Sequence, residues 1–62
     1  MKEYIDFLFV DTETSEEFLV EVENTTNVKR EAIEIAREVF ENPILIRRMS
    51  VEEAEQMGID TY

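Results

Sequence analysis

Residues 4–10 read YIDFLFV, and this stretch decides the fold. It is rich in aromatic and β-branched residues, which favour strands, and it is nearly apolar on both of its alternating faces. A strand that is apolar on both faces is typical of the centre of a sheet, where other parts of the protein cover it from both sides. The sequence therefore predicts that residues 4–10 form a central strand.

Two further strands are expected on either side of it. A polar connection of hairpin-loop type at residues 11–16 leads into residues 18–23, FLVEVE. The even-numbered positions of this second stretch are all apolar and share one face of a strand, whereas two of its odd-numbered positions are glutamates. Residues 44–49, ILIRRM, are the third strand candidate.

The segment between the second and third strands has the period of a helix. Apolar residues recur at three- and four-residue spacing over residues 28–41, which builds one apolar stripe. Residues 24–27 supply side chains of the N-cap type, and the Asn-Pro pair at residues 42–43 ends the helix. Two ion pairs one turn apart are expected on the outer face: Arg30 with Glu34, and Arg37 with Glu41.

A second, shorter helix is expected over residues 51–57. Ser50 and Glu53 form the sequence pattern of a capping box, with serine at the N-cap and glutamate three residues later. Gly58 suits the left-handed position that follows many helices. The last three residues, 60–62, are expected to form a tail.

The predicted element order is β-β-α-β-α in a single α+β domain over residues 1–62. The first two strands form a hairpin, and the long helix reverses the chain direction so that the third strand runs antiparallel to the first. The sheet is then three-stranded and antiparallel with the order 2-1-3. The long helix packs its apolar stripe on one face of the sheet, and the short helix closes the chain.

Composition restricts the class of protein. The chain has 62 residues, with 16 acidic and six basic side chains, a net charge of −10, and neither histidine nor cysteine. A hydrophobic content of 44% in ordered patterns argues against disorder. Disulfides are excluded, no cofactor is expected, no apolar run approaches the length of a membrane span, and the start of the chain lacks the apolar segment of a signal peptide. We therefore expect a cytoplasmic protein.

Catalysis and metal binding are not expected. Histidine and cysteine, the usual general base and thiol nucleophile, are absent, and a catalytic pair of carboxylates needs a pocket that separates the two pKa values, which a chain this short is poorly able to build. Alternate acidic and hydroxyl residues from Asp11 to Glu17 are similar to the opening of an EF-hand loop. That loop requires glycine at its sixth position and glutamate at its twelfth, where this chain has Glu16 and Val22.

Direct nucleic-acid binding is also disfavoured, because phosphate contacts need clustered lysine and arginine. The only tight basic pairs are residues 29–30 and residues 47–48. In a strand, Arg47 and Arg48 point to opposite faces, and we expect each of them to pair with an acidic neighbour across the sheet, such as Glu21 or Glu23.

The acidic residues are distributed unevenly. Residues 11–23 contain six acids and no base, and residues 51–62 contain four more acids and no base. Carboxylates two residues apart on one strand face lie about 6.6 Å apart, an interval comparable to that between successive DNA phosphates. Such a surface can occupy a groove built for a phosphate backbone and is steered there by its field. The alternative is a solvated acidic face that only keeps a small protein soluble.

The closing run at residues 50–62, SVEEAEQMGIDTY, resembles the closing segment of small acidic uncharacterised proteins of phages and mobile elements. Some proteins of that type are DNA mimics, including inhibitors of restriction or CRISPR nucleases. The resemblance implies an anti-CRISPR or DNA-mimic type of function. It transfers no functional residue, and a well-capped helix explains most of the same run.

Two hypotheses follow for the function, and neither is enzymatic. In the first, the protein inhibits a nucleic-acid-binding protein or a nuclease, such as a CRISPR or restriction effector, by occupying its basic channel without touching nucleic acid. In the second, it is a protein–protein interaction module that uses a sheet edge or an apolar patch marked by Leu19, and it forms a homodimer. The first hypothesis places the contacts at eight acidic residues: Asp11, Glu13, Glu17, Glu21, Glu23, Glu52, Glu53 and Glu55.

Overall fold

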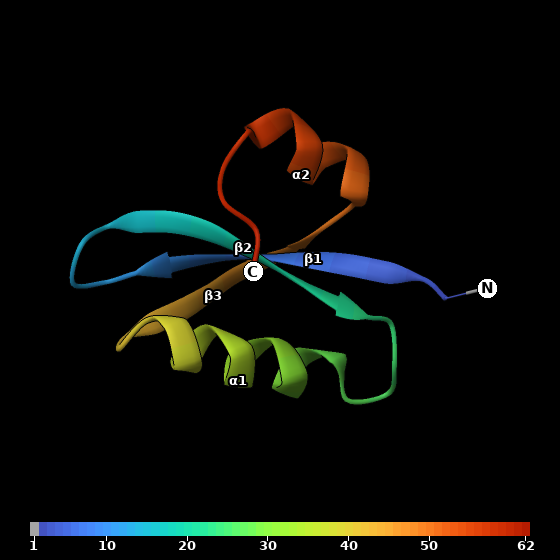
Figure 1. The fold of residues 1–62 in the computed structure, drawn as a ribbon, viewed down its shortest axis with the longest axis horizontal. Coiled ribbons are helices and arrows are strands. Elements are labelled where there is room, and N and C mark those ends of the chain that lie inside the picture. The colour runs from blue at the N-terminus through green and yellow to red at the C-terminus, as the bar shows by residue number, and fades with distance from the viewer. Residues whose placement is uncertain (1) are drawn as a thin grey trace.

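The computed structural model describes residues 2–62 and confirms the predicted α+β architecture (Figure 1). The sheet has the order β2-β1-β3, with both pairings antiparallel, so the strand that is apolar on both faces does lie at the centre. Met1 lies outside the described residues. The elements are β1 (Tyr4–Asp11), β2 (Glu16–Glu23), α1 (Val28–Val39), β3 (Pro43–Met49) and α2 (Val51–Met57).

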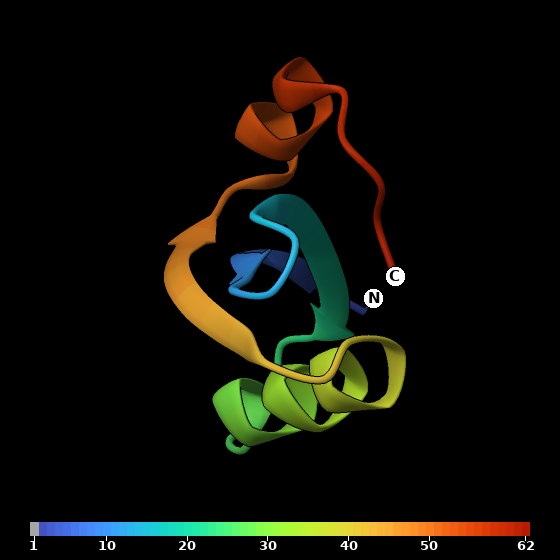
Figure 2. The same cartoon turned by 90° about the vertical axis from the view of Figure 1, so that its left-hand side faces the viewer.

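The two helices cover opposite faces of the sheet, which gives three layers (Figure 2). The larger core lies under α1, as predicted, and the smaller one lies under α2, whose position the sequence did not predict. Both faces of β1 are therefore covered, which explains its composition. The buried residues of the α1 core are Ile5, Phe7, Phe9, Phe18, Val20, Val22, Ala32 and Ala36, and those of the α2 core are Leu8, Leu19, Met49 and Ala54.

An irregularity in β3 decides where its arginines point. Leu8 of β1 is opposite Arg47, whereas the next residue, Phe9, is opposite Leu45, so Ile46 is an extra residue in the ladder. Leu45 consequently packs against the α1 core, and Arg47 lies on the α2 side. The expected pairing of the arginines with β2 is wrong, because β3 pairs only with β1.

The C-terminal residues are more than a tail, because they extend the sheet beyond β2. Thr61 forms a parallel bridge with Leu19, and backbone hydrogen bonds of 2.8 to 3.0 Å join residues 60 and 62 to β2. The ring of Tyr62 then packs edge-on against Phe18 and Phe40, each with a centroid separation of 5.7 Å. This segment therefore connects the α2 layer to the α1 core.

The helix ends follow the local sequence, with one correction. Helix α1 ends at Val39, two residues before the predicted end, because Phe40 is extended and its ring stacks on Phe18. Within residues 2–62 the expected ion pair of Arg37 with Glu41 does not form, whereas the pair of Arg30 with Glu34 is present at 3.8 Å. Helix α2 has the predicted bounds, the predicted capping box and a left-handed Gly58 with φ of 64°.

The capping box gives a first prediction. The Ser50 hydroxyl accepts a hydrogen bond from the Glu53 amide, and the Glu53 carboxylate accepts one from the Ser50 amide. Replacing Ser50 by alanine leaves an amide of the first turn without a partner, so we expect the free energy of unfolding to fall by about 1 kcal/mol. Urea titration followed by circular dichroism measures this change.

Thr26→Ala is the control, because this exposed hydroxyl makes no hydrogen bond within residues 2–62. Equal losses in the two variants would show that the cap contributes nothing of its own.

Candidate acidic interface

The eight acidic residues predicted as contacts all lie on the β1–β2 hairpin or on α2, but they are not equivalent. Asp11 is buried, with an exposed fraction of 4%, and its carboxylate accepts hydrogen bonds from the Thr14 hydroxyl at 3.0 Å and from the Glu13 amide at 3.5 Å. Ser15 follows in the left-handed conformation, with its amide bonded to the Asp11 carbonyl. Asp11 thus holds the hairpin loop together and is not an exposed contact residue.

Two more of the eight residues have partners inside the domain. The Glu13 carboxylate accepts a hydrogen bond from the Asn42 side chain at 3.2 Å. The Glu53 carboxylate caps α2 and also lies 3.4 Å from the guanidinium of Arg47. The Ser50 amide and hydroxyl and the Arg47 charge lower the pKa of Glu53. Both carboxylates therefore already bind side chains or amides of the domain itself.

The remaining five predicted residues are exposed glutamates without an ion pair within residues 2–62. Alternation along β2 places Glu17 and Glu23 on the same strand face as Glu21. The other two, Glu52 and Glu55, lie on α2, which covers that face. The hairpin acids and the helix acids therefore lie on the same side of the sheet.

Glu21 and Glu55 approach one another around a third acid, Asp6, which sequence reasoning missed. A small cavity of about 170 Å³ between β1, β2, α2 and the C-terminal segment is lined by these three residues, and no lysine or arginine of the described part of the chain lines it. Asp6 is only 2% exposed, and its Oδ1 has no hydrogen-bond partner among residues 2–62. Burial, followed by the charges of Glu21 and then Glu55, raises the pKa of Asp6. We refer to Asp6, Glu21 and Glu55 as the acidic cluster.

The sequence does mark Asp6 as unusual, because it is the one charged residue in the otherwise apolar stretch of residues 4–10. Buried charges are costly unless they are paired, so an acid at such a position indicates either a hidden partner or an unrelieved cost. Arg47, the cation of β3 on the α2 side, pairs with Glu53. The cost at Asp6 is therefore unrelieved within residues 2–62.

Within residues 2–62 no group of three acidic side chains is arranged to hold a metal ion. In the same part of the chain, neither helix is long and apolar enough to cross a membrane.

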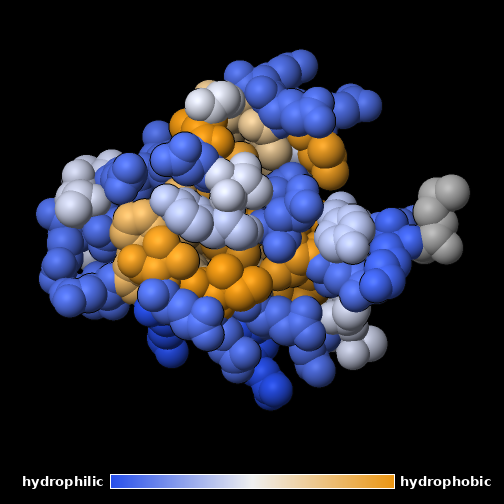
Figure 3. Space-filling view, in the orientation of Figure 1, coloured by the Kyte–Doolittle hydropathy of each residue, from blue (hydrophilic) through white to orange (hydrophobic). Residues whose placement is uncertain are grey.

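The structure does not expose the sheet edge that the second hypothesis, an interaction module marked by Leu19, would use. Leu19, its marker, is only 1% exposed, because it belongs to the α2 core and the C-terminal segment covers the β2 edge. The uncovered edge is that of β3, where Ile44 and Ile46 are each 51% exposed. In Figure 3 the outer side of α2 is hydrophilic, and apolar surface gathers between α1 and the strands.

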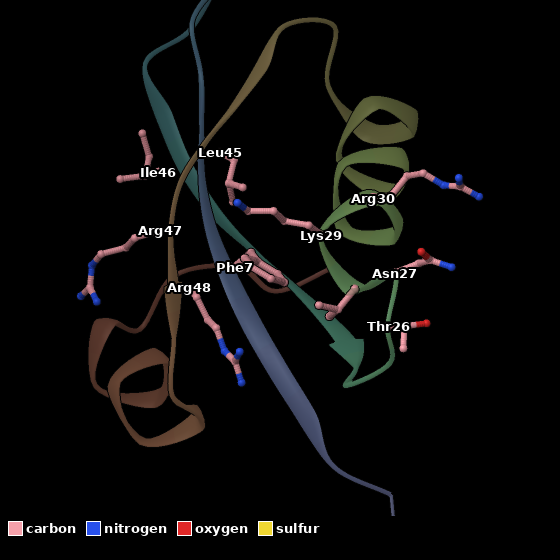
Figure 4. A pocket seen from close by; sticks show the side chains of 10 residues that line it. Phe7, Thr26, Asn27, Lys29, Arg30, Leu45, Ile46, Arg47 and Arg48 are labelled. Carbon is pink, nitrogen blue, oxygen red and sulfur yellow. The ribbon is translucent and has the colours of Figure 1, made fainter.

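A second cavity has the opposite electrostatic character. It lies between the start of α1 and β3, has a volume of about 810 Å³, and is lined by Lys29, Arg30, Arg47 and Arg48. Figure 4 shows Lys29 and Arg48 on either side of Phe7, whereas Arg30 and Arg47 point outward. The basic residues thus gather at the start of α1 and on β3, away from the acidic cluster.

Comparison with protein-family models, with curated proteins and with solved structures found no match to this chain.

The unrelieved carboxylate gives a second prediction. We expect Asp6→Asn to raise the free energy of unfolding at pH 7 by about 1 to 2 kcal/mol, because it removes an unpaired buried charge beside Glu21 and Glu55. The asparagine amide can donate to those carboxylates. Thermal and urea unfolding of the two proteins at one pH measures the difference.

The pH dependence follows from the raised pKa. A folded-state pKa above the ordinary value of 3.8 means that the folded protein holds the Asp6 proton more tightly than the unfolded chain does. The contribution of Asp6 to stability is therefore largest below 3.8 and is lost as the pH rises through the raised pKa. The advantage of Asp6→Asn over the wild type should shrink on acidification. An advantage that does not change with pH would contradict this account.

Proposed function

We propose that this protein is a small acidic binding protein that inhibits a nucleic-acid-binding protein or nuclease by occupying its basic channel. The observation that supports this function is the acidic cluster. Two acid-rich segments that are far apart in the sequence meet around Asp6, and no basic side chain of the described residues lines their cavity. The acids of the hairpin and of α2 thereby contribute to one surface.

The energetics favour a basic partner. The domain keeps an unrelieved charge at Asp6, and its pKa is raised by burial and by its acidic neighbours. A cationic side chain placed near Glu21 and Glu55 lowers that repulsion, so binding gains free energy from a cost already present in the free protein. The field of a net charge of −10 also accelerates encounter with a basic surface.

The geometry suits a channel that normally holds a phosphate backbone. Glu21 and Glu23 lie two residues apart on one strand face, which corresponds to about 6.6 Å. Strand pairing fixes the backbone that carries them, and α2 adds the exposed Glu52 and Glu55 alongside. Because the backbone is already ordered, the entropy cost of binding at these positions is confined to the exposed glutamate side chains.

Capture from cell lysate at two salt concentrations tests the proposal. The immobilised protein should retain nucleic-acid-binding proteins at about 50 mM salt and release them at about 500 mM, because exposed charge pairs are screened at high ionic strength. Duplex DNA added at low salt should displace the same proteins. Partners that stay bound at high salt, or that duplex DNA does not displace, would contradict DNA mimicry.

The β3 edge favours a second candidate function, a protein-interaction module. Its outer backbone groups are uncovered, and Ile44 and Ile46 beside them are half exposed, which suits addition of a strand from a second copy. Pro43 and the arginines of β3 oppose such pairing, as edge residues often do. Sedimentation across a range of concentrations decides, because a dimer lost in Ile46→Lys supports the module and a strict monomer excludes self-association.

A further inference from the structure

The groove between the start of α1 and β3, on the other side of the sheet from the acidic cluster, has no role in the proposed function. We propose that it binds an acidic and apolar segment of a partner protein. Its floor and walls include apolar residues from three elements, namely Phe7, Val28 and Leu45. Four of the six basic residues of the chain border it, namely Lys29, Arg30, Arg47 and Arg48, but the guanidinium of Arg47 lies on the α2 side of the sheet, where it pairs with Glu53.

The charges of this groove are only partly neutralised by the domain itself. Arg30 pairs with Glu34, and Arg47 pairs with Glu53. Within residues 2–62, Lys29 and Arg48 have no acidic partner within ion-pair distance. Figure 4 shows Lys29 reaching towards Leu45 and Arg48 lying below Phe7, whereas Arg30 points away from the groove. Two free cations therefore flank an apolar floor.

The start of α1 adds to the positive potential of the groove. Thr26 and Asn27 line it just before the helix, and Asn27, at the N-cap, makes no side-chain hydrogen bond to the first turn. The partial positive charge of a helix N-terminus favours an anionic group nearby. This feature favours an anionic ligand, as do Lys29 on the same helix and Arg48 on β3.

The shape and the net charge decide the class of ligand. Small-molecule sites enclose most of the ligand, whereas this groove is open along its length between a helix and a strand. The half-exposed Ile46 continues the apolar surface at its border. A net charge of −10 repels a polyanion such as nucleic acid, but it opposes a short segment with two or three carboxylates much less. An acidic and apolar peptide segment meets all of these conditions.

Selection from a random peptide library displayed on phage tests the proposal without a known partner. The wild-type protein should enrich peptides that combine aspartate or glutamate with leucine, isoleucine or phenylalanine. One selected peptide is then synthesised and titrated into the protein, with backbone amide shifts as the readout. We expect the largest shifts at Phe7, at the start of α1 and at Arg48.

Two variants with the same change in net charge locate the binding site. Lys29→Glu with Arg48→Glu should weaken the selected peptide at least about tenfold, because two charge-assisted contacts become repulsive. The control, Lys2→Glu with Arg37→Glu, changes two exposed residues that do not line the groove and should bind within about twofold of the wild type. Circular dichroism verifies that both variants are folded.

Several outcomes would overturn the groove proposal. These are the absence of any enriched acidic peptide, an acidic peptide that the double groove variant binds as tightly as the wild type does, and equal loss in the control. Enrichment of basic peptides alone would also overturn it and would instead support the acidic cluster. The groove and the proposed inhibitory surface can therefore fail independently.

Discussion

Replacing Phe18 by alanine is expected to unfold the domain. Phe18 is 1% exposed and lies at the centre of the aromatic cluster, where its ring stacks on Phe9 at 5.4 Å and on Phe40 at 4.2 Å. Tyr62 packs edge-on against the same ring, so the C-terminal segment also loses its attachment to the α1 core. A single truncation therefore affects β1, β2, the end of α1 and the C-terminal segment.

The expected loss of stability is comparable to the free energy of unfolding of the whole domain. A buried Phe→Ala change costs about 3 to 5 kcal/mol. At about 0.05 to 0.15 kcal/mol per residue, the whole stability of a domain of this size is about 3 to 9 kcal/mol. Loss of the cooperative thermal transition by circular dichroism, together with collapse of amide shift dispersion, is the expected result.

Val39→Ala is the control for this prediction, because it truncates a side chain that is 45% exposed on the same layer. Its transition should remain close to that of the wild type. A Phe18→Ala protein that melts cooperatively near the wild-type temperature would show that the aromatic cluster is not the centre of the core.

Patterns local in the sequence predicted the strands, the helices and the sheet order correctly. The apolar first strand had to be central, and the helix between the second and third strands reversed the chain. The capping box at Ser50 was also predictable, because it involves residues only three positions apart. The end of α1 was not, since the aromatic cluster holds Phe40 in an extended conformation.

Features that depend on contacts between distant segments were missed. The placement of α2 on the second sheet face follows from Leu8 and Leu19, but alternation alone does not say which helix covers them. The bridge formed by Thr61 is isolated, and the last three residues, 60–62, are too few to show the alternating pattern of a strand. The extra residue at Ile46 changes which face each arginine of β3 occupies, and no glycine or proline at that position marks it. The basic groove could not be foreseen for the same reason.

The candidate site was predicted in outline only. The hairpin and α2 were expected as acidic patches, and one acid from each, Glu21 and Glu55, lines the same cavity. Sequence reasoning gave equal weight to Asp11, which is held inside its loop, and to Glu21, which borders the acidic cluster. Hydrogen-bond partners distinguish the two residues, and a sequence does not contain them.

Charge reversal at Glu21 and Glu55 is expected to have the largest effect on binding. These two residues flank Asp6, so lysines there neutralise the acidic cluster and place cations against the basic partner. Removing one partner of a charge pair buried in an interface costs about 2 to 5 kcal/mol, so the loss is expected to be at least about thirtyfold at low salt. The same lysines relieve the repulsion on Asp6, and the folded state should therefore be retained.

A variant of equal net charge isolates the position of the acids from their number. Glu38→Lys with Glu41→Lys also raises the net charge from −10 to −6, because each reversal adds two charges. Both residues are exposed, Glu38 on α1 and Glu41 just after it, and they do not line the cavity around Asp6. A protein that is acidic only for solubility responds to the two variants alike.

The most direct measurement therefore captures proteins from lysate at about 50 mM salt and displaces them with duplex DNA. Quantitative mass spectrometry then compares the displaced proteins for the wild type and the two double variants. The proposed function predicts that Glu21→Lys with Glu55→Lys loses these proteins, while Glu38→Lys with Glu41→Lys keeps them. Equal loss from both variants, or equal retention by both, would contradict a binding surface built around Asp6.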